Sequence, residues 1–141
     1  MTDLSDLIER VRKAEGPDRE LDCYLEALSD GRTIRESIHP QYGRQLLARN
    51  SRPPHDEYWI DHPDNGTKPY TGSLDAITAL IEKELPGCAY GFDNGPKTHL
   101  AFVDRHDHAV RFLGARWTAE AATIPLALCL AFLLSLQEIS K

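Results

Sequence analysis

Apolar side chains near the start of the chain recur at the spacing of amphipathic helices. The first stripe is formed by Leu4, Leu7, Ile8 and Val11. The second stripe is formed by Leu21, Tyr24, Leu25 and Leu28. Because each set repeats at i, i+3, i+4 and i+7, both predict short helices, and Gly16 and Pro17 separate them. Gly31 ends the second, so residues 1–31 are expected to form a helical hairpin.

A third helix and three strands are predicted in the second half. The helix begins near Thr71 or Ser73 and ends at Leu85, before a Pro-Gly pair. Its inward residues are Leu74, Ile77, Ile81 and Leu85. The β-prone runs that follow cover residues 88–92, 98–104 and 109–113. Their short, turn-rich connections favour an antiparallel meander.

The last predicted element is an unusually apolar helix. Thr123 suits the N-cap, Pro125 is tolerated in the first turn, and the sequence LALCLAFLLSLQ then leaves no polar stripe. A helix that is apolar on every side is expected to be buried. The predicted fold class is therefore α+β: an antiparallel meander of three to four strands covered by helices.

Residues 32–68 give the weakest pattern. Residues 32–56 combine Pro, Gly, Asn and Arg without a sustained period, which predicts a loop with at most a short strand near 33–38. Residues 57–61, EYWID, are β-prone, and a strong turn signal follows at 63–66. We interpret the chain as a single domain, 1–141, made of the helical hairpin (1–31), this arginine-containing segment (32–68) and a helix, meander and helix (69–141).

Composition narrows the class of protein without naming an activity. The 141 residues are 41% hydrophobic and 27% charged, as in a globular chain. The longest apolar run, 124–136, is shorter than a membrane span, and no basic, apolar signal segment opens the chain. Three widely spaced cysteines fit neither a disulfide framework nor a zinc site. These features predict a cytoplasmic protein with no membrane partner and no cofactor.

The net charge of −6 is divided unevenly along the chain. Residues 1–31 have a balance of −5, residues 32–56 a balance of +3, and the remainder −4. Overall acidity argues against a partner as extended as DNA or RNA. All five cations of the positive segment are arginines, which match phosphate oxygens in a bidentate manner. A small, local anion site is therefore possible.

Three stretches resemble a known family: AEGPDRELDCYLEAL at 14–28, PYTGSLDAITALIEKELPG at 69–87 and ATIPLALCLAFLLSL at 122–136. Together they resemble the small phage and prophage proteins described as having a phage ABA (α/β/α) sandwich domain. The resemblance implies a phage protein that is found in the infected bacterial host. Small accessory phage proteins often act in counter-defence, by binding a host protein or by sequestering nucleotide immune signals. No catalytic residue is implied.

The leading functional prediction is a binding protein without enzymatic activity. Arginines and the start of the third helix would hold phosphate, and aromatic rings would stack on a base. The ligand would be a small nucleotide-derived immune signal, such as a cyclic dinucleotide or an ADP-ribose derivative. The candidate ligand-binding residues are Arg35, Arg44, Arg49, Arg52, His55, Trp59, Tyr70, Thr71, Ser73, Arg116 and Trp117. A homo-oligomer, built through the apolar last helix, would help to form such pockets.

Other roles for the same residues stay open at this level. The arginines could pair with the acidic helices, Ser73 could be an ordinary cap, and Trp117 could cover the core. One rival function is a protein–protein inhibitor whose acidic helical surface covers a basic host protein. Another is a metal-dependent phosphodiesterase that uses His106 and His108 with Asp104 or His99, although a hairpin tip seldom gives rigid ligand geometry.

Overall fold

Four helices and six strands make up the part of the chain that this computed structural model describes, residues 4–50, 52–62, 65–94, 99–105 and 115–139. In chain order they are α1 (Leu4–Lys13), α2 (Arg19–Ser29), β1 (Arg32–His39), β2 (Gly43–Asn50), β3 (Glu57–Trp59), α3 (Leu74–Glu84), β4 (Ala89–Asn94), β5 (His99–Arg105), β6 (Ala115–Ala121) and α4 (Ile124–Ile139). The strands form two three-stranded antiparallel sheets, β1-β2-β3 (sheet A) and β4-β5-β6 (sheet B). The α+β class, the helical hairpin and the apolar last helix are confirmed.

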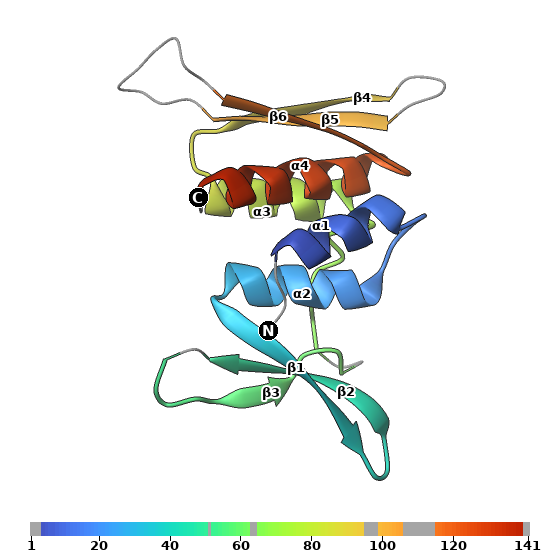
Figure 1. Ribbon diagram of the computed structural model, residues 1–141, viewed down its shortest axis with the longest axis vertical. Coiled ribbons are helices and arrows are strands. Elements are labelled where there is room, and N and C mark those ends of the chain that lie inside the picture. The colour runs from blue at the N-terminus through green and yellow to red at the C-terminus, as the bar shows by residue number, and fades with distance from the viewer. Residues whose placement is uncertain (1–3, 51, 63–64, 95–98, 106–114, 140–141) are drawn as a thin grey trace.

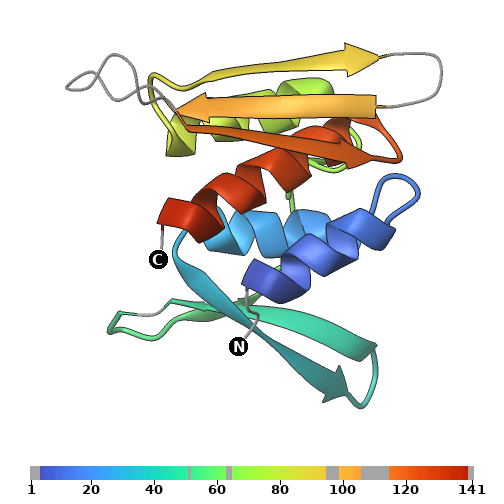
Figure 2. The same cartoon turned by 45° about the horizontal axis from the view of Figure 1, so that its top comes forward.

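The layers differ from the expected order. Sheet B lies on α3 and α4, these helices lie on α1 and α2, and sheet A covers the other side of the helical hairpin (Figure 1). The helices are thus between two sheets, not on the two faces of one sheet, as a rotated view also shows (Figure 2). The physical reason is the all-apolar helix α4, which needs partners on every side. It packs on β5 and β6 on one side and on α1 on the other.

The short strand predicted near 33–38 lies within β1, but the prediction of a loop over the rest of residues 32–56 is wrong, because most of this segment is a hairpin. Strands β1 and β2 pair from Arg32 opposite Asn50 to His39 opposite Gly43. Only one apolar residue of β1, Ile34, is buried, and the remaining positions are largely charged or polar. The strand therefore lacks the apolar alternation by which strands are found in a sequence. Gly43 has a φ of +77°, which suits the tight turn that joins the strands.

Sheet B confirms the predicted antiparallel meander with one shift. Residues 109–113, expected to form its third strand, lie outside the described residues, and β6 is instead Ala115–Ala121. Arg116 and Trp117 therefore belong to a strand and not to a connection. On the face turned away from the helices, the ring of Phe102 lies over Gly91, where a Cβ would come within 2.6 Å of Phe102 Cζ. Glycine at this position leaves room for the aromatic ring.

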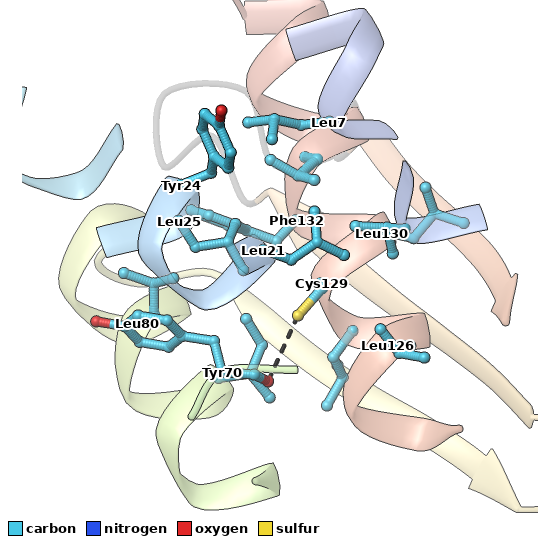
Figure 3. Close-up of a cluster of buried hydrophobic side chains, with 14 of the residues drawn as sticks. Leu7, Leu21, Tyr24, Leu25, Tyr70, Leu80, Leu126, Cys129, Leu130 and Phe132 are labelled. Atoms are coloured by element: carbon cyan, nitrogen blue, oxygen red, sulfur yellow. Dashed lines mark hydrogen bonds between the residues drawn. The ribbon is translucent and has the colours of Figure 1, made fainter. Parts of the chain in front are cut away.

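The core lies between the helices and extends to both sheets. Residues 126–133 of α4 are all buried, together with side chains from α1, α2 and α3 (Figure 3). Local sequence sets the helix starts, since Asp18 accepts a hydrogen bond from the N–H of Leu21 and Thr123 accepts one from Leu126. The helical layer thus gives sheet A a firm support on one face and leaves its other face toward solvent.

Candidate functional site

The face of sheet A turned away from the helices carries several of the predicted binding residues. Ile34 and Ala48 are buried against the helices, so their neighbours along each strand point the other way. One row across the sheet contains Arg35, Leu47 and Trp59, and the next row contains Thr33, Arg49 and Glu57. We call this surface the outer face of sheet A.

Arg35 and Arg49 lie together on this face, at a pocket of about 230 Å³ lined also by Thr33 and Ile34. The guanidinium of Arg35 donates two hydrogen bonds of 2.7 Å to the carboxylate of Glu57. These bonds lower the pKa of Glu57, and the nearby charge of Arg49 lowers it further. Among the described residues, no carboxylate lies within 4.0 Å of the Arg49 guanidinium. Arg49 therefore has hydrogen-bonding capacity for an external anion.

Aromatic rings continue the outer face from Trp59. The ring of Trp59 meets His62 edge to face with centroids 4.5 Å apart, and it lies 5.7 Å from the ring of Tyr42, which is itself 4.8 Å from His39. A second shallow pocket of about 300 Å³ is lined by Tyr58, Trp59, His62 and Asn65. The buried Nε1 of Trp59 has no acceptor among the described residues.

Arg44 does not belong to the outer face, because its side chain faces the helices and forms ion pairs there. Its guanidinium donates to both oxygens of Glu20 on α2, at 3.1 and 3.0 Å, and also to Glu36 on β1. Arg10 approaches the same Glu20 carboxylate at 3.1 Å. The hydrogen bond from Arg44 and the charge of Arg10 lower the pKa of Glu20, against its partial burial. Arg44 therefore pairs with an acidic helix, which was the alternative role for the arginines. Its side chain does not lie on the outer face of sheet A.

Arg52 and His55 lie in the connection between β2 and β3. Both side chains are exposed. The N–H of Arg52 donates to Oδ1 of Asn50, and Nδ1 of His55 is 3.1 Å from the carbonyl oxygen of Asn50. The connection therefore holds these two residues at the end of the sheet nearest Arg49.

The N–H groups at the start of α3, which were expected to bind a ligand anion, are hydrogen-bonded to other groups of the protein. The N–H of Thr71 donates to Oδ1 of Asp22 at 2.8 Å, and the N–H groups of Gly72 and Ser73 donate to the carbonyl of Pro69. The hydroxyl of Tyr70 donates to Glu26. Tyr70 and Thr71 are buried, so these residues join α2 to α3. A carboxylate of the protein already occupies the place that a ligand phosphate was expected to fill.

Ser73 acts as the N-cap of α3, because its Oγ accepts a hydrogen bond of 3.2 Å from the N–H of Ala76. We expect Ser73→Ala to lower the free energy of unfolding by about 1 kcal/mol, since one N–H of the first turn loses its acceptor. Urea denaturation followed by circular dichroism measures the change. Ser73→Asn keeps an acceptor and should retain most of the stability; an equal loss in both variants would contradict a capping role.

Arg116 and Trp117 lie on sheet B, on the far side of the helical layers from sheet A (Figure 1). Arg116 donates two hydrogen bonds to the carboxylate of Asp104, at 2.6 and 2.8 Å, and its guanidinium lies 4.4 Å from the centre of the Phe102 ring. These two predicted residues therefore cannot share a small ligand with Arg49 or Trp59.

The residues of the metal-dependent alternative lie in other parts of the chain. His106 and His108 lie outside the described residues, and Asp104 is paired with Arg116. Within the described ranges, no group of three or more His, Cys, Asp and Glu side chains is arranged to hold a metal ion. Burial raises the pKa of the Cys23 thiol to about 11. A thiol with such a pKa is a poor nucleophile near neutral pH, in line with a packing role.

Several residues of the outer face were missed by sequence reasoning. Tyr42, Leu47, Glu57, His62 and Asn65 were not predicted as part of the site. Leu47 and Glu57 are placed by the register of β1, β2 and β3, which a prediction of loop over residues 32–56 could not supply. Tyr42, His62 and Asn65 lie in the connections and reach this surface through their contacts with or beside Trp59. The nearest available signal was the aromatic pair in EYWID, a segment that is β-prone in sequence and forms β3 in the structure.

Known proteins give no guidance on this surface. No protein-family model, no curated protein and no solved structure matches the chain. Of the helices in the described ranges, none has the length and apolar character that crossing a membrane requires. Function therefore has to be inferred from the outer face of sheet A.

Proposed function

We propose that this protein binds a small nucleotide-like anion on the outer face of sheet A. The observation that carries the proposal is the joint placement of Arg35 and Arg49 at one pocket, with Arg35 in the same row of the sheet as Trp59 and Arg49 in the next row. Guanidinium groups bind phosphate oxygens, and an aromatic ring offers a face or an edge to a base. Both features are present on three neighbouring strands.

Each group has a distinct part in this proposal. Arg49 takes the first phosphate oxygens, and Arg52 and His55 lie at the same end of the sheet for a second anionic group. Arg35 keeps its bonds to Glu57 and adds positive charge. Trp59 packs against the base with its ring. The proposed mechanism is sequestration, in which the ligand is bound and not altered.

The resemblance to phage α/β/α sandwich proteins suggests a biological setting for such binding. We propose that the ligand is a bacterial immune signal, either a cyclic dinucleotide or an ADP-ribose derivative, and that its capture blunts a host defence. Purified protein would be incubated with a mixture of cyclic dinucleotides and ADP-ribose, freed of unbound material and heated. Mass spectrometry should then find an intact nucleotide in the released fraction. Release of an altered nucleotide, or of none, would overturn sequestration.

Arg49→Ala should weaken nucleotide binding by about tenfold or more, since a charged hydrogen bond contributes more than about 1.4 kcal/mol. Isothermal titration calorimetry with the recovered nucleotide measures the affinity. Arg12→Ala is the control, because Arg12 is also exposed but lies on α1 and pairs with Glu9. Equal affinities of the two variants would remove Arg49 from the site.

A further inference from the structure

The free edge of sheet A offers a second binding surface. Strand β1 is the first of the order β1-β2-β3 and pairs only with β2 in the described chain. It is eight residues long, and Thr33, Arg35, Glu36 and Ile38 along it are exposed. An exposed edge of this length carries backbone N–H and C=O groups that can pair with another strand.

Pockets lie on both sides of this edge at Thr33 and Ile34. On the side of the helices, a pocket of about 180 Å³ is lined mostly by apolar side chains of α1 and α2. Its lining residues are Leu7, Tyr24, Ala27, Leu28, Arg32, Thr33 and Ile34. On the other side is the pocket at Arg35 and Arg49. Because side chains of a strand alternate between two faces, a strand added to β1 would reach both pockets with neighbouring residues.

The chemistry of the two pockets defines the partner. Among the described residues, no carboxylate lines either pocket, whereas Arg32, Arg35 and Arg49 contribute to them. On the helix side, Ile38 follows Ile34 by four residues and is 83% exposed, so a second apolar contact is available further along the edge. An added strand therefore matches best if apolar residues face the helices and acidic residues face Arg35.

We propose that β1 binds an extended segment of a partner protein in which apolar and acidic residues alternate, by adding it as a fourth strand to sheet A. Main-chain hydrogen bonds would supply affinity and the two pockets would supply specificity, as in other cases of strand addition. The surface joins the free edge and the helix-side pocket to the pocket at Arg35 and Arg49, which it shares with the proposed nucleotide site. Trp59 belongs to the nucleotide site alone, so a variant at Trp59 separates the two proposals.

The test uses the full chain and a labelled octapeptide in which valine and glutamate alternate. Fluorescence anisotropy should show saturable binding. Two further peptides carry N-methyl groups on one or the other alternate set of amides. Because only one edge of an added strand pairs with β1, one methylated peptide should bind at least about tenfold more weakly and the other within about twofold. Equal affinity of the two methylated peptides would overturn strand addition.

A matched pair of variants locates the peptide on the protein. Thr33→Asp adds a negative charge to an exposed residue of β1, and Thr118→Asp makes the same change on an exposed residue of β6. We expect about tenfold weaker peptide binding for Thr33→Asp and no change for Thr118→Asp. Equal effects would overturn the assignment to β1.

Two further measurements distinguish strand addition from nucleotide binding and from self-association. Trp59→Ala should weaken nucleotide binding and leave peptide binding intact, so each proposal can fail alone. Light scattering and amide hydrogen exchange without peptide test whether a second copy of this chain covers the edge. A monomer with exchangeable β1 amides supports the proposal, whereas a dimer that protects these amides overturns it.

Discussion

Phe132→Ala should lower the free energy of unfolding by about 3–5 kcal/mol, the usual cost of removing a fully buried phenylalanine. The side chain is 1% exposed and lies on α4, the helix that packs against sheet B and α1. Figure 3 shows it beside Leu21 and Leu25 of α2. The cavity would open between layers that are held by several elements, so little collapse is available to fill it.

Guanidinium chloride denaturation, monitored by tryptophan fluorescence and by circular dichroism, measures this loss. Leu134→Ala is the matched control, because Leu134 is on the same helix but only partly buried. Its cost should be clearly smaller. If the two substitutions destabilise the protein equally, Phe132 is not packed more deeply than Leu134, which would contradict the placement of Phe132 in the core.

Thr71→Val should lower the free energy of unfolding by about 2–4 kcal/mol, because it leaves the N–H of Asp18 without its acceptor and removes one of the two hydrogen bonds from Thr71 to the buried carboxylate of Asp22. The hydroxyl of Thr71 accepts a hydrogen bond of 2.8 Å from the N–H of Asp18 and donates one of 2.7 Å to Asp22. Valine keeps the shape of threonine, so the change tests the hydrogen bonds and not the packing. Thr71→Ser keeps the hydroxyl and should retain most of the stability.

The loss in Thr71→Val should grow with pH. Burial raises the pKa of Asp22 above its usual range, and the two hydrogen bonds from Thr71 oppose this rise. Between the unfolded pKa, near 3.8, and the raised folded pKa, the folded state binds more protons, so stability falls as pH increases. In Thr71→Val, the loss of one hydrogen bond raises the pKa of Asp22 in the folded state further. The pH range over which stability falls therefore becomes wider. Denaturation at pH 4 and pH 7 should show the larger difference from wild type at pH 7; the opposite order would contradict this assignment.

The helices could be predicted because each one carries its own signal. The stripes of α1 and α2, the cap at Ser73 and the apolar run after Thr123 are all local patterns. Strand β2 was missed and β1 was predicted only as a short strand near 33–38, because the helices support the hairpin on one face only. Ile34 is the only buried apolar residue of β1, and the buried Leu46 and Ala48 of β2 do not make a sustained alternating pattern. Arg44 bridges Glu20 and Glu36 across the hairpin, a contact between residues that are distant in the sequence.

The candidate site was predicted in composition but not in arrangement. Arginines and aromatic residues were recognised as the right chemistry, and Arg35, Arg49 and Trp59 do lie on one face of sheet A. Thr71 was grouped with them because the start of a helix can bind phosphate, and Tyr70 because its ring could stack on a base. The structure turns these two residues toward α2, where Glu26 and Asp22 receive their hydrogen bonds. Sequence order alone could not distinguish an inner helix start from an exposed one.

The helical layers also separate the two sheets, and this separation affects whether substitutions on one sheet influence the other. The outer faces of sheets A and B lie at opposite ends of the molecule, with α1, α2, α3 and α4 between them (Figure 1). Substitutions that are more than about 10 Å apart and share no partner usually have additive effects on stability. Either face can therefore accumulate new surface residues while the other keeps its own, so one fold can acquire a new partner without giving up an earlier one.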